Sequence, residues 1–175
     1  SVYGEKIFTN TGVSTYDYSD RRTLERSTVS HNTVYNGVGE QSEIWSRFRV
    51  ARHAKVLKRE IVKNKIIGKY QNFSKKYTVE RIIKFQDNGF SIEDFSNRNL
   101  GEINFYCMPG VKVIKLGNLI SVGKHLIMEC EKGMEVSLVE YDFAQSYNLL
   151  KKSIRVNIKC HVATSVIRFS IRDDK

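Results

Sequence analysis

Residues 154–160 read Ile-Arg-Val-Asn-Ile-Lys-Cys, and this strict alternation of apolar and polar side chains decides the fold class. Successive side chains of an extended strand point to opposite faces, so Ile154, Val156, Ile158 and Cys160 share one face. The polar residues between them share the other. Such a pattern is typical of an antiparallel strand that has one face on a core and one toward solvent.

The same period of two recurs along the chain, in segments 44–50, 103–107 and 167–171. Turn signals separate such segments at intervals of about 8–15 residues. The strongest is Asp87-Asn88-Gly89, because a glycine after asparagine supplies the positive φ angles of a tight hairpin. This rhythm predicts an all-β, antiparallel, multi-stranded β-sandwich and argues against a βαβ fold.

Four segments carry more specific expectations. Residues 13–16 have the pattern of a strand, 21–26 can form one helical turn, and 142–150 fit a short helix or an irregular loop. Segment 55–76 is the most basic stretch, and its interspersed isoleucines indicate a solvated strand face or a hairpin edge protected by lysines.

Composition limits the class of protein. The 175 residues suit one domain, 1–175, and 41% apolar residues suffice for a packed core. No apolar run approaches the roughly 18 residues of a membrane helix, which predicts a soluble domain with no membrane partner. The net charge of +10 is compatible with nucleic acid or an acidic glycan. No zinc-finger, RNP-type or helix-turn-helix pattern supports nucleic-acid binding, so we expect none.

The three cysteines, Cys107, Cys130 and Cys160, are far apart and form no Cys-x-x-Cys pair. Cys107 and Cys160 alternate with apolar residues, which favours buried core thiols over a disulfide or a catalytic nucleophile at these two positions. The chain starts at Ser1 without a methionine or a signal-peptide pattern. A domain cut from a longer protein would begin in this way.

The segment that stands out chemically is Arg26-Ser27-Thr28-Val29-Ser30-His31-Asn32-Thr33-Val34. Before it comes Gly12-Val13-Ser14-Thr15-Tyr16, followed by Arg21-Arg22. After it come Asn36-Gly37 and an aromatic and arginine-rich stretch, Trp45–Arg52. A lone histidine is more often structural, so the significance of His31 depends on the neighbouring segments.

Together these segments resemble the C-terminal β-sandwich domain of the heparinase II/III-like polysaccharide lyases. That family has a Gly-x-x-Thr-Tyr strand, an arginine-rich turn and an Arg-x-Thr-x-x-His-Asn-Thr-Val segment, then a short hairpin and an aromatic-arginine strand. Pro109-Gly110-Val111 and Ser146-Tyr147 resemble later passages of the family. The resemblance covers nearly the whole chain and is most specific at residues 10–41.

The resemblance implies a super-sandwich fold and a role in cleaving a uronate-containing acidic polysaccharide by β-elimination. Such a lyase removes the C5 proton of a hexuronate, expels the sugar at C4 and stabilises charge on the C5 carboxylate. In the family a tyrosine that acts as base or acid and a neutralising Asn or His come from an N-terminal helical toroid, which is missing from these residues. The sandwich contributes a cleft histidine, which implies His31 as the catalytic residue here.

The resemblance and the residue chemistry also suggest substrate contacts. Arg22, Arg26 and Arg47 could bind carboxylate or sulfate bidentately, and Asn32 and Tyr147 could contact the sugar. The structural alternatives are that His31 caps a turn, that the arginines are surface charges, and that Tyr147 packs at the core edge. For Tyr16 we favour packing over stacking on a sugar.

Some family members bind zinc through a second histidine, whose position here is Thr33. The remaining histidines lack ligand spacing, so we expect no metal and no cofactor.

The resemblance suggests a periplasmic or secreted protein. Because the base is absent, the 175 residues alone should be inactive. The alternative is a non-catalytic carbohydrate-binding or structural sandwich domain.

Overall fold

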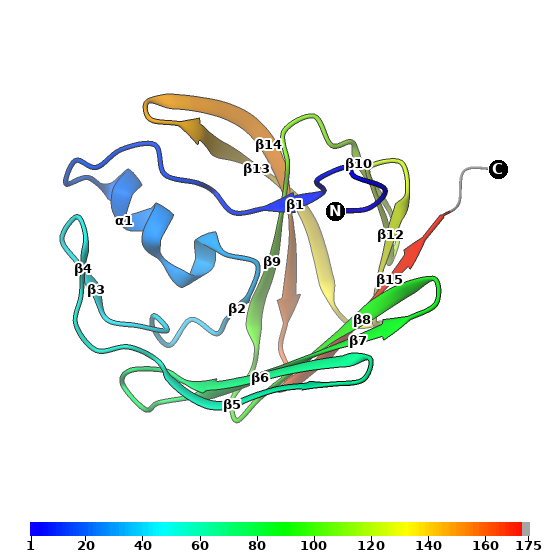
Figure 1. The fold of residues 1–175 in the computed structure, drawn as a ribbon, viewed down its shortest axis with the longest axis horizontal. Coiled ribbons are helices and arrows are strands. Elements are labelled where there is room, and N and C mark those ends of the chain that lie inside the picture. Colours follow the sequence, from blue (N-terminus) through cyan, green and yellow to red (C-terminus); the bar gives the residue numbers. More distant parts are fainter. Residues whose placement is uncertain (173–175) are drawn as a thin grey trace.

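The computed structural model describes residues 1–172 as two large antiparallel sheets with helix α1 (Asp20–Arg26) at their side (Figure 1). The expected all-β, antiparallel sandwich is confirmed. The larger sheet has the strand order β10-β11-β12-β15-β8-β7-β6-β5. Its strands are β5 (Lys55–Val62), β6 (Lys65–Gln71), β7 (Thr78–Gln86), β8 (Gly89–Ser96), β10 (Val113–Leu116), β11 (Leu119–Val122), β12 (Leu126–Cys130) and β15 (Thr164–Ile171).

The smaller sheet has the order β1-β9-β14-β13. Strands β1 and β2 both pair with β9, β1 at Tyr106 and Cys107 and β2 at Glu102 and Ile103. Its strands are β1 (Phe8–Thr9), β2 (Val34–Tyr35), β9 (Gly101–Cys107), β13 (Glu135–Ser146) and β14 (Leu149–Cys160). The two-stranded hairpin β3 (Ile44–Trp45) and β4 (Arg49–Val50) lies beside α1 (Figure 1).

The core lies between the inner faces of the two sheets. Phe105 of β9 meets Phe169 of β15 edge to face, with ring centroids 5.6 Å apart. Val156 and Ile158 of β14 are fully buried, as the alternation of 154–160 predicts. The expectation of a solvated second face is wrong for Asn157 of β14, which is buried, and for β9, where Asn104 and Tyr106 are buried as well. Hydrogen bonds from the side chains of Asn104 and Tyr106 to Val29 of the neighbouring 3-10 turn cover that face.

The predicted hairpin at Asp87-Asn88-Gly89 is confirmed between β7 and β8. Its glycine has a φ of +154°, and a Cβ atom there would lie 1.9 Å from the carbonyl oxygen of Phe169 on the adjacent strand β15. Glycine is therefore required by the close approach of a neighbouring backbone, in addition to the turn itself.

Gly89→Ala is expected to lower the free energy of unfolding by about 2 kcal/mol or more, because the methyl group must displace main-chain atoms of β15. Gly68→Ala is the matched control, since no atom lies within 4 Å of its Cβ position. It should change stability by less than about 1 kcal/mol. Urea unfolding of the two variants measures the difference, and equal midpoints would contradict the prediction.

Three local expectations are wrong. Segment 44–50 is a tight hairpin instead of one strand, because Ser46 turns the chain at a φ of +54°. Segment 142–150 is neither helix nor loop but the end of the long β13–β14 hairpin, closed by Asn148 at a φ of +54°. Segment 13–16 pairs with no strand, since the Ser14 amide donates to the buried Glu25 carboxylate.

Other expectations are confirmed. The helical turn predicted at 21–26 is α1, N-capped by Ser19. The basic segment contains the β5–β6 hairpin, and β5 is the edge strand of the larger sheet. Cys107 and Cys160 are buried free thiols, as expected, and Cys130 is a third. Burial raises the pKa of Cys107 and Cys130 to about 12. No helix in residues 1–172 is long and apolar enough to cross a membrane.

Candidate functional site

His31 follows a short 3-10 helix, η1 (Thr28–Ser30), and has an extended backbone. Its amide donates to the Thr28 carbonyl at 3.2 Å, which closes the turn. The Ser27 and Ser30 hydroxyls both donate to the Leu24 carbonyl at the end of α1, at 2.7 and 2.5 Å. The main chain before the histidine is therefore held by α1 through hydroxyl caps.

Asn32 holds the main chain after the histidine. Its side-chain oxygen accepts from the Tyr106 amide at 2.7 Å, and its Nδ2 donates to the Thr9 carbonyl at 2.7 Å. Thr9, the last residue of β1, is the register partner of Tyr106, so the side-chain amide of Asn32 bridges the Thr9 carbonyl and the Tyr106 amide where β1 leaves β9. Asn32 thereby holds the main chain next to His31 against the edge of β9.

An ion pair between a partly buried arginine and a buried carboxylate supports the same segment. Arg81 of β7 donates from Nε and Nη2 to both oxygens of Asp94 at 2.7 and 2.8 Å. Its Nη1 donates to the Asn32 carbonyl at 2.6 Å. The Asp94 side chain is 0% exposed. This bidentate pair connects the larger sheet to the residue after His31.

The imidazole of His31 is half-buried. Burial lowers its pKa below the ordinary 6.5, and the negative charge of Glu40 opposes this shift in part. Glu40 is itself engaged, because it accepts from the amide and the hydroxyl of Thr28, both at 2.5 Å. His31 is therefore largely neutral near pH 7 and can accept a proton.

The lowered pKa of His31 predicts a loss of stability on the acid side. The unfolded state binds more protons than the folded state from about pH 6.5 downward, so the free energy of unfolding falls as the pH drops through this range. His31→Gln should remove this contribution and flatten the curve in urea unfolding between about pH 7 and 5.5. His53→Gln, at an exposed position, should follow the unmodified protein. Identical curves for all three proteins would contradict the prediction.

Arg26 and Arg22 bind the main chain of the β3–β4 hairpin. Arg26 donates from Nη1 to the Ser46 carbonyl at 2.7 Å and from Nη2 to the Arg49 carbonyl at 2.8 Å. Arg22 is buried, and its Nε donates to the Arg47 carbonyl at 3.0 Å. Burial and the proximity of Arg22 lower the pKa of Arg26. Both guanidinium groups therefore position the hairpin.

Arg47 lies at the turn of this hairpin and is exposed. Tyr147, at the β13–β14 turn, is 54% exposed and stacks on Tyr16 with centroids 5.8 Å apart. Phe48 approaches Tyr16 at 5.5 Å from the other hairpin, and Arg22 lies near both rings. We call Tyr16, Phe48 and Tyr147 the aromatic platform. Tyr16 contacts these two rings and is 51% exposed.

The predicted residues thus fall into two groups. One group lies at the aromatic platform and contains Arg22, Arg47 and Tyr147. The other lies beside the edge of β9 and contains His31 and Asn32. Among residues 1–172, no hydrogen bond, ion pair or ring contact joins His31 to the platform. Thr33 accepts from Gln41 Nε2 at 3.4 Å. Within the described part of the chain no three His, Cys, Asp or Glu side chains lie close enough to hold a metal ion.

Sequence reasoning missed Arg81, Asp94 and Glu40. The Arg81–Asp94 pair could have been found, because a two-residue turn at Asp87-Asn88 places these residues opposite each other on β7 and β8. No pattern in the sequence indicates that Arg81 also reaches Asn32, or that Glu40 lies near His31. Both contacts depend on how the loops cross the sheets.

Comparison with known proteins gives a consistent result. The family described as "Heparinase II/III-like, C-terminal" matches residues 1–171. A heparinase III structure superposes with a TM-score of 0.67 at 14% identity over 95% of this chain. The heparan sulfate lyase HepC of Pedobacter heparinus superposes with a TM-score of 0.69 at 16% identity over 98% of it.

The chain spans 28% of that heparinase III chain and 29% of the HepC chain. At this level of identity the superpositions establish the shared sandwich fold. A search of curated proteins finds no match. The family match extends over nearly every residue, including the His31 segment, so the chain belongs to the heparinase II/III-like C-terminal family.

Proposed function

We propose that this chain is the sandwich domain of a lyase that cleaves a uronate-containing acidic polysaccharide by β-elimination, with His31 as its cleft residue. The observation that carries the proposal is the state of His31. Its backbone is fixed on both sides, its ring is half-buried, and its pKa is lowered, so that the imidazole is neutral near pH 7. Membership of the heparinase II/III-like family supports the reaction class.

A neutral imidazole suits one part of the elimination. It can take up a proton as the C5–H bond breaks, or donate a hydrogen bond to the sugar. The resemblance assigns a tyrosine that acts as base or acid, and the carboxylate neutraliser, to an N-terminal helical domain. The chain spans 28–29% of its solved relatives, so activity is proposed for the complete protein and not for these 175 residues alone.

Arg47 and Tyr147 are the proposed contacts to the polysaccharide. Arg47 is exposed beside the aromatic platform, where its guanidinium can bind a carboxylate or sulfate while a sugar ring lies on the half-exposed aromatic rings. Arg22, Arg26 and Asn32 have main-chain partners and are proposed to position these contacts and His31. They would influence substrate binding indirectly.

The proposal is tested with the product of the complete reading frame and a panel of heparan sulfate, chondroitin sulfate and alginate. Formation of unsaturated uronate ends is followed by their ultraviolet absorbance. We expect at least one polymer to yield such ends, and the 175-residue chain to yield none. Cleavage to saturated ends, or no cleavage of any uronate polymer, would overturn the proposal.

A second function, binding of an anionic polysaccharide without catalysis, is favoured by the distribution of charge. Residues 55–86, which include β5, β6 and β7, contain ten Lys and Arg against two Glu, a net charge of +8 of the chain's +10. Three of these lysines pair with glutamates, at Lys58, Lys69 and Lys84. Salt-dependent retention of the chain on immobilised heparin, with an inactive complete protein, would select this second function.

A further inference from the structure

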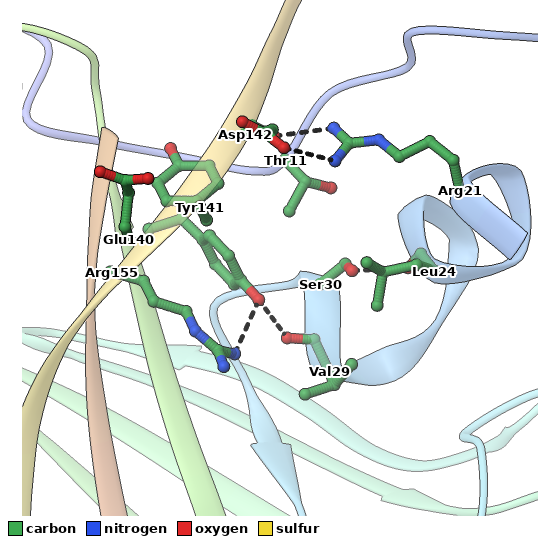
Figure 2. A pocket seen from close by; sticks show the side chains of 10 residues that line it. Thr11, Arg21, Leu24, Val29, Ser30, Glu140, Tyr141, Asp142 and Arg155 are labelled. Carbon is green, nitrogen blue, oxygen red and sulfur yellow. Dashed lines mark hydrogen bonds and ion pairs between the residues drawn. The ribbon is translucent and has the colours of Figure 1, made fainter. Parts of the chain in front are cut away.

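A cavity of about 310 Å³ lies between α1, η1 and the outward face of the smaller sheet (Figure 2). Its lining comes from segments far apart in the sequence and includes Thr11, Ser30, Tyr106, Tyr141 and Arg155. Neither His31 nor the aromatic platform lines it. Its size falls at the lower end of the range of small-ligand sites in proteins.

Arg155 provides a positive charge in this cavity. One of its terminal nitrogens, Nη1, donates to the Tyr106 hydroxyl and to Asn104 Oδ1, both at 3.2 Å. Asn104 is held in turn by Asn157 at 2.9 Å. No carboxylate in residues 1–172 forms an ion pair with Arg155. The guanidinium is thus fixed by neutral partners and keeps donors for an anionic group.

Thr11 supplies a second, independent observation that points to a ligand. The residue is 7% exposed, and its hydroxyl has no hydrogen-bond partner. A buried hydroxyl without a partner is costly, since the desolvation of the group is not compensated. Figure 2 shows the Thr11 side chain between the strands and the helical segment that bears Ser30.

Carboxylates form another part of the lining. Glu140 and Asp142 of β13 both pair with Lys152, at 3.3 and 2.8 Å, and Asp142 also faces Arg21 (Figure 2). Carboxylate oxygens have several lone pairs and can accept hydrogen bonds from hydroxyl groups of a ligand as well. They would repel a small anion without hydroxyl groups, such as sulfate.

From this juxtaposition we propose that the cavity binds one carboxylate-bearing sugar unit, a hexuronate, at a site separate from His31. The ligand's carboxylate accepts from Arg155 and the Thr11 hydroxyl, and its hydroxyl groups donate to Glu140 and Asp142. The choice of a uronate as the acid sugar rests on the proposed function. The cation, the unpartnered hydroxyl and the carboxylates are features of the cavity itself.

The test is a titration of the isotope-labelled 175-residue chain with D-glucuronate, followed by the amide NMR shifts of Ser30, Tyr106 and Asp142. We expect saturable shifts with glucuronate and none with glucose or inorganic sulfate at equal concentration. Arg155→Gln should weaken binding at least about tenfold. Arg168→Gln, the same change at an exposed position of β15, should leave it unchanged.

The variant Thr11→Val tests the site without disturbing the fold. It removes a hydroxyl that has no partner, so it should not lower the melting temperature, and yet it should weaken glucuronate binding about two- to tenfold. His31→Ala should bind glucuronate as well as the unmodified chain does, which separates this site from the proposed lyase activity. Unchanged affinity in the Arg155 and Thr11 variants, equal binding of sulfate, or no saturable shifts would overturn the inference.

Discussion

His31→Ala in the complete protein is expected to lower kcat for eliminative cleavage at least about 100-fold, the usual contribution of a positioned acid or base. The imidazole is neutral near pH 7 because burial lowers its pKa, and the main chain of His31 is held between the turn of η1 and the hydrogen bonds of the Asn32 side chain. Loss of a proton-transfer group affects the transition state more than the bound ground state. KM should therefore change far less than kcat.

Two controls make this prediction specific. His53→Ala changes an exposed histidine and should leave kcat within about twofold. Arg47→Ala removes a proposed substrate contact and should raise KM more than it lowers kcat, the reverse of the His31 pattern. The rate of formation of unsaturated uronate ends gives both constants. A His31→Ala enzyme with an unchanged kcat would remove the histidine from the mechanism.

The strands with a strict period of two could be predicted because burial on one face imposes it. Val156 and Ile158 lie on the core and are found where the alternation places them. The pattern fails where local contacts outweigh it. Segment 44–50 alternates and is nevertheless a hairpin, because Arg26 binds the carbonyls of Ser46 and Arg49 and fixes the turn. Such a partner, 20 residues away, leaves no periodic signal.

The candidate site was predictable in its residue types and less so in its geometry. His31 and Asn32 were both identified from one motif, and a role in substrate binding was expected for Asn32. The structure gives Asn32 two main-chain partners, which depend on β1 ending at Thr9. The alternation of 154–160 places Arg155 on the solvated side of a strand, but Arg155 lines a cavity because α1 and η1 cover that face. The way the loops cross the sheets thus determines which side chains line the site.

Arg81→Met is expected to lower the free energy of unfolding by about 3–5 kcal/mol, the largest stability effect that we predict. Asp94 is 0% exposed, and without Arg81 its charge would stay buried and unpaired. Lys69→Met removes a partner of Glu80 from the neighbouring strand, where the side chains are 39% and 25% exposed. That control should cost no more than about 1 kcal/mol, because exposed pairs contribute little.

The double variant Arg81→Met, Asp94→Leu distinguishes a buried charge from lost packing. If the unpaired carboxylate causes the loss, replacing it by an apolar side chain should recover part of the stability. The hydrogen bond from Arg81 to the Asn32 carbonyl stays absent in both variants, so the segment that carries His31 should remain loosened. The double variant of the complete protein should therefore regain stability without regaining full activity. Urea unfolding beside the cleavage assay measures both, and a double variant less stable than Arg81→Met would contradict this account.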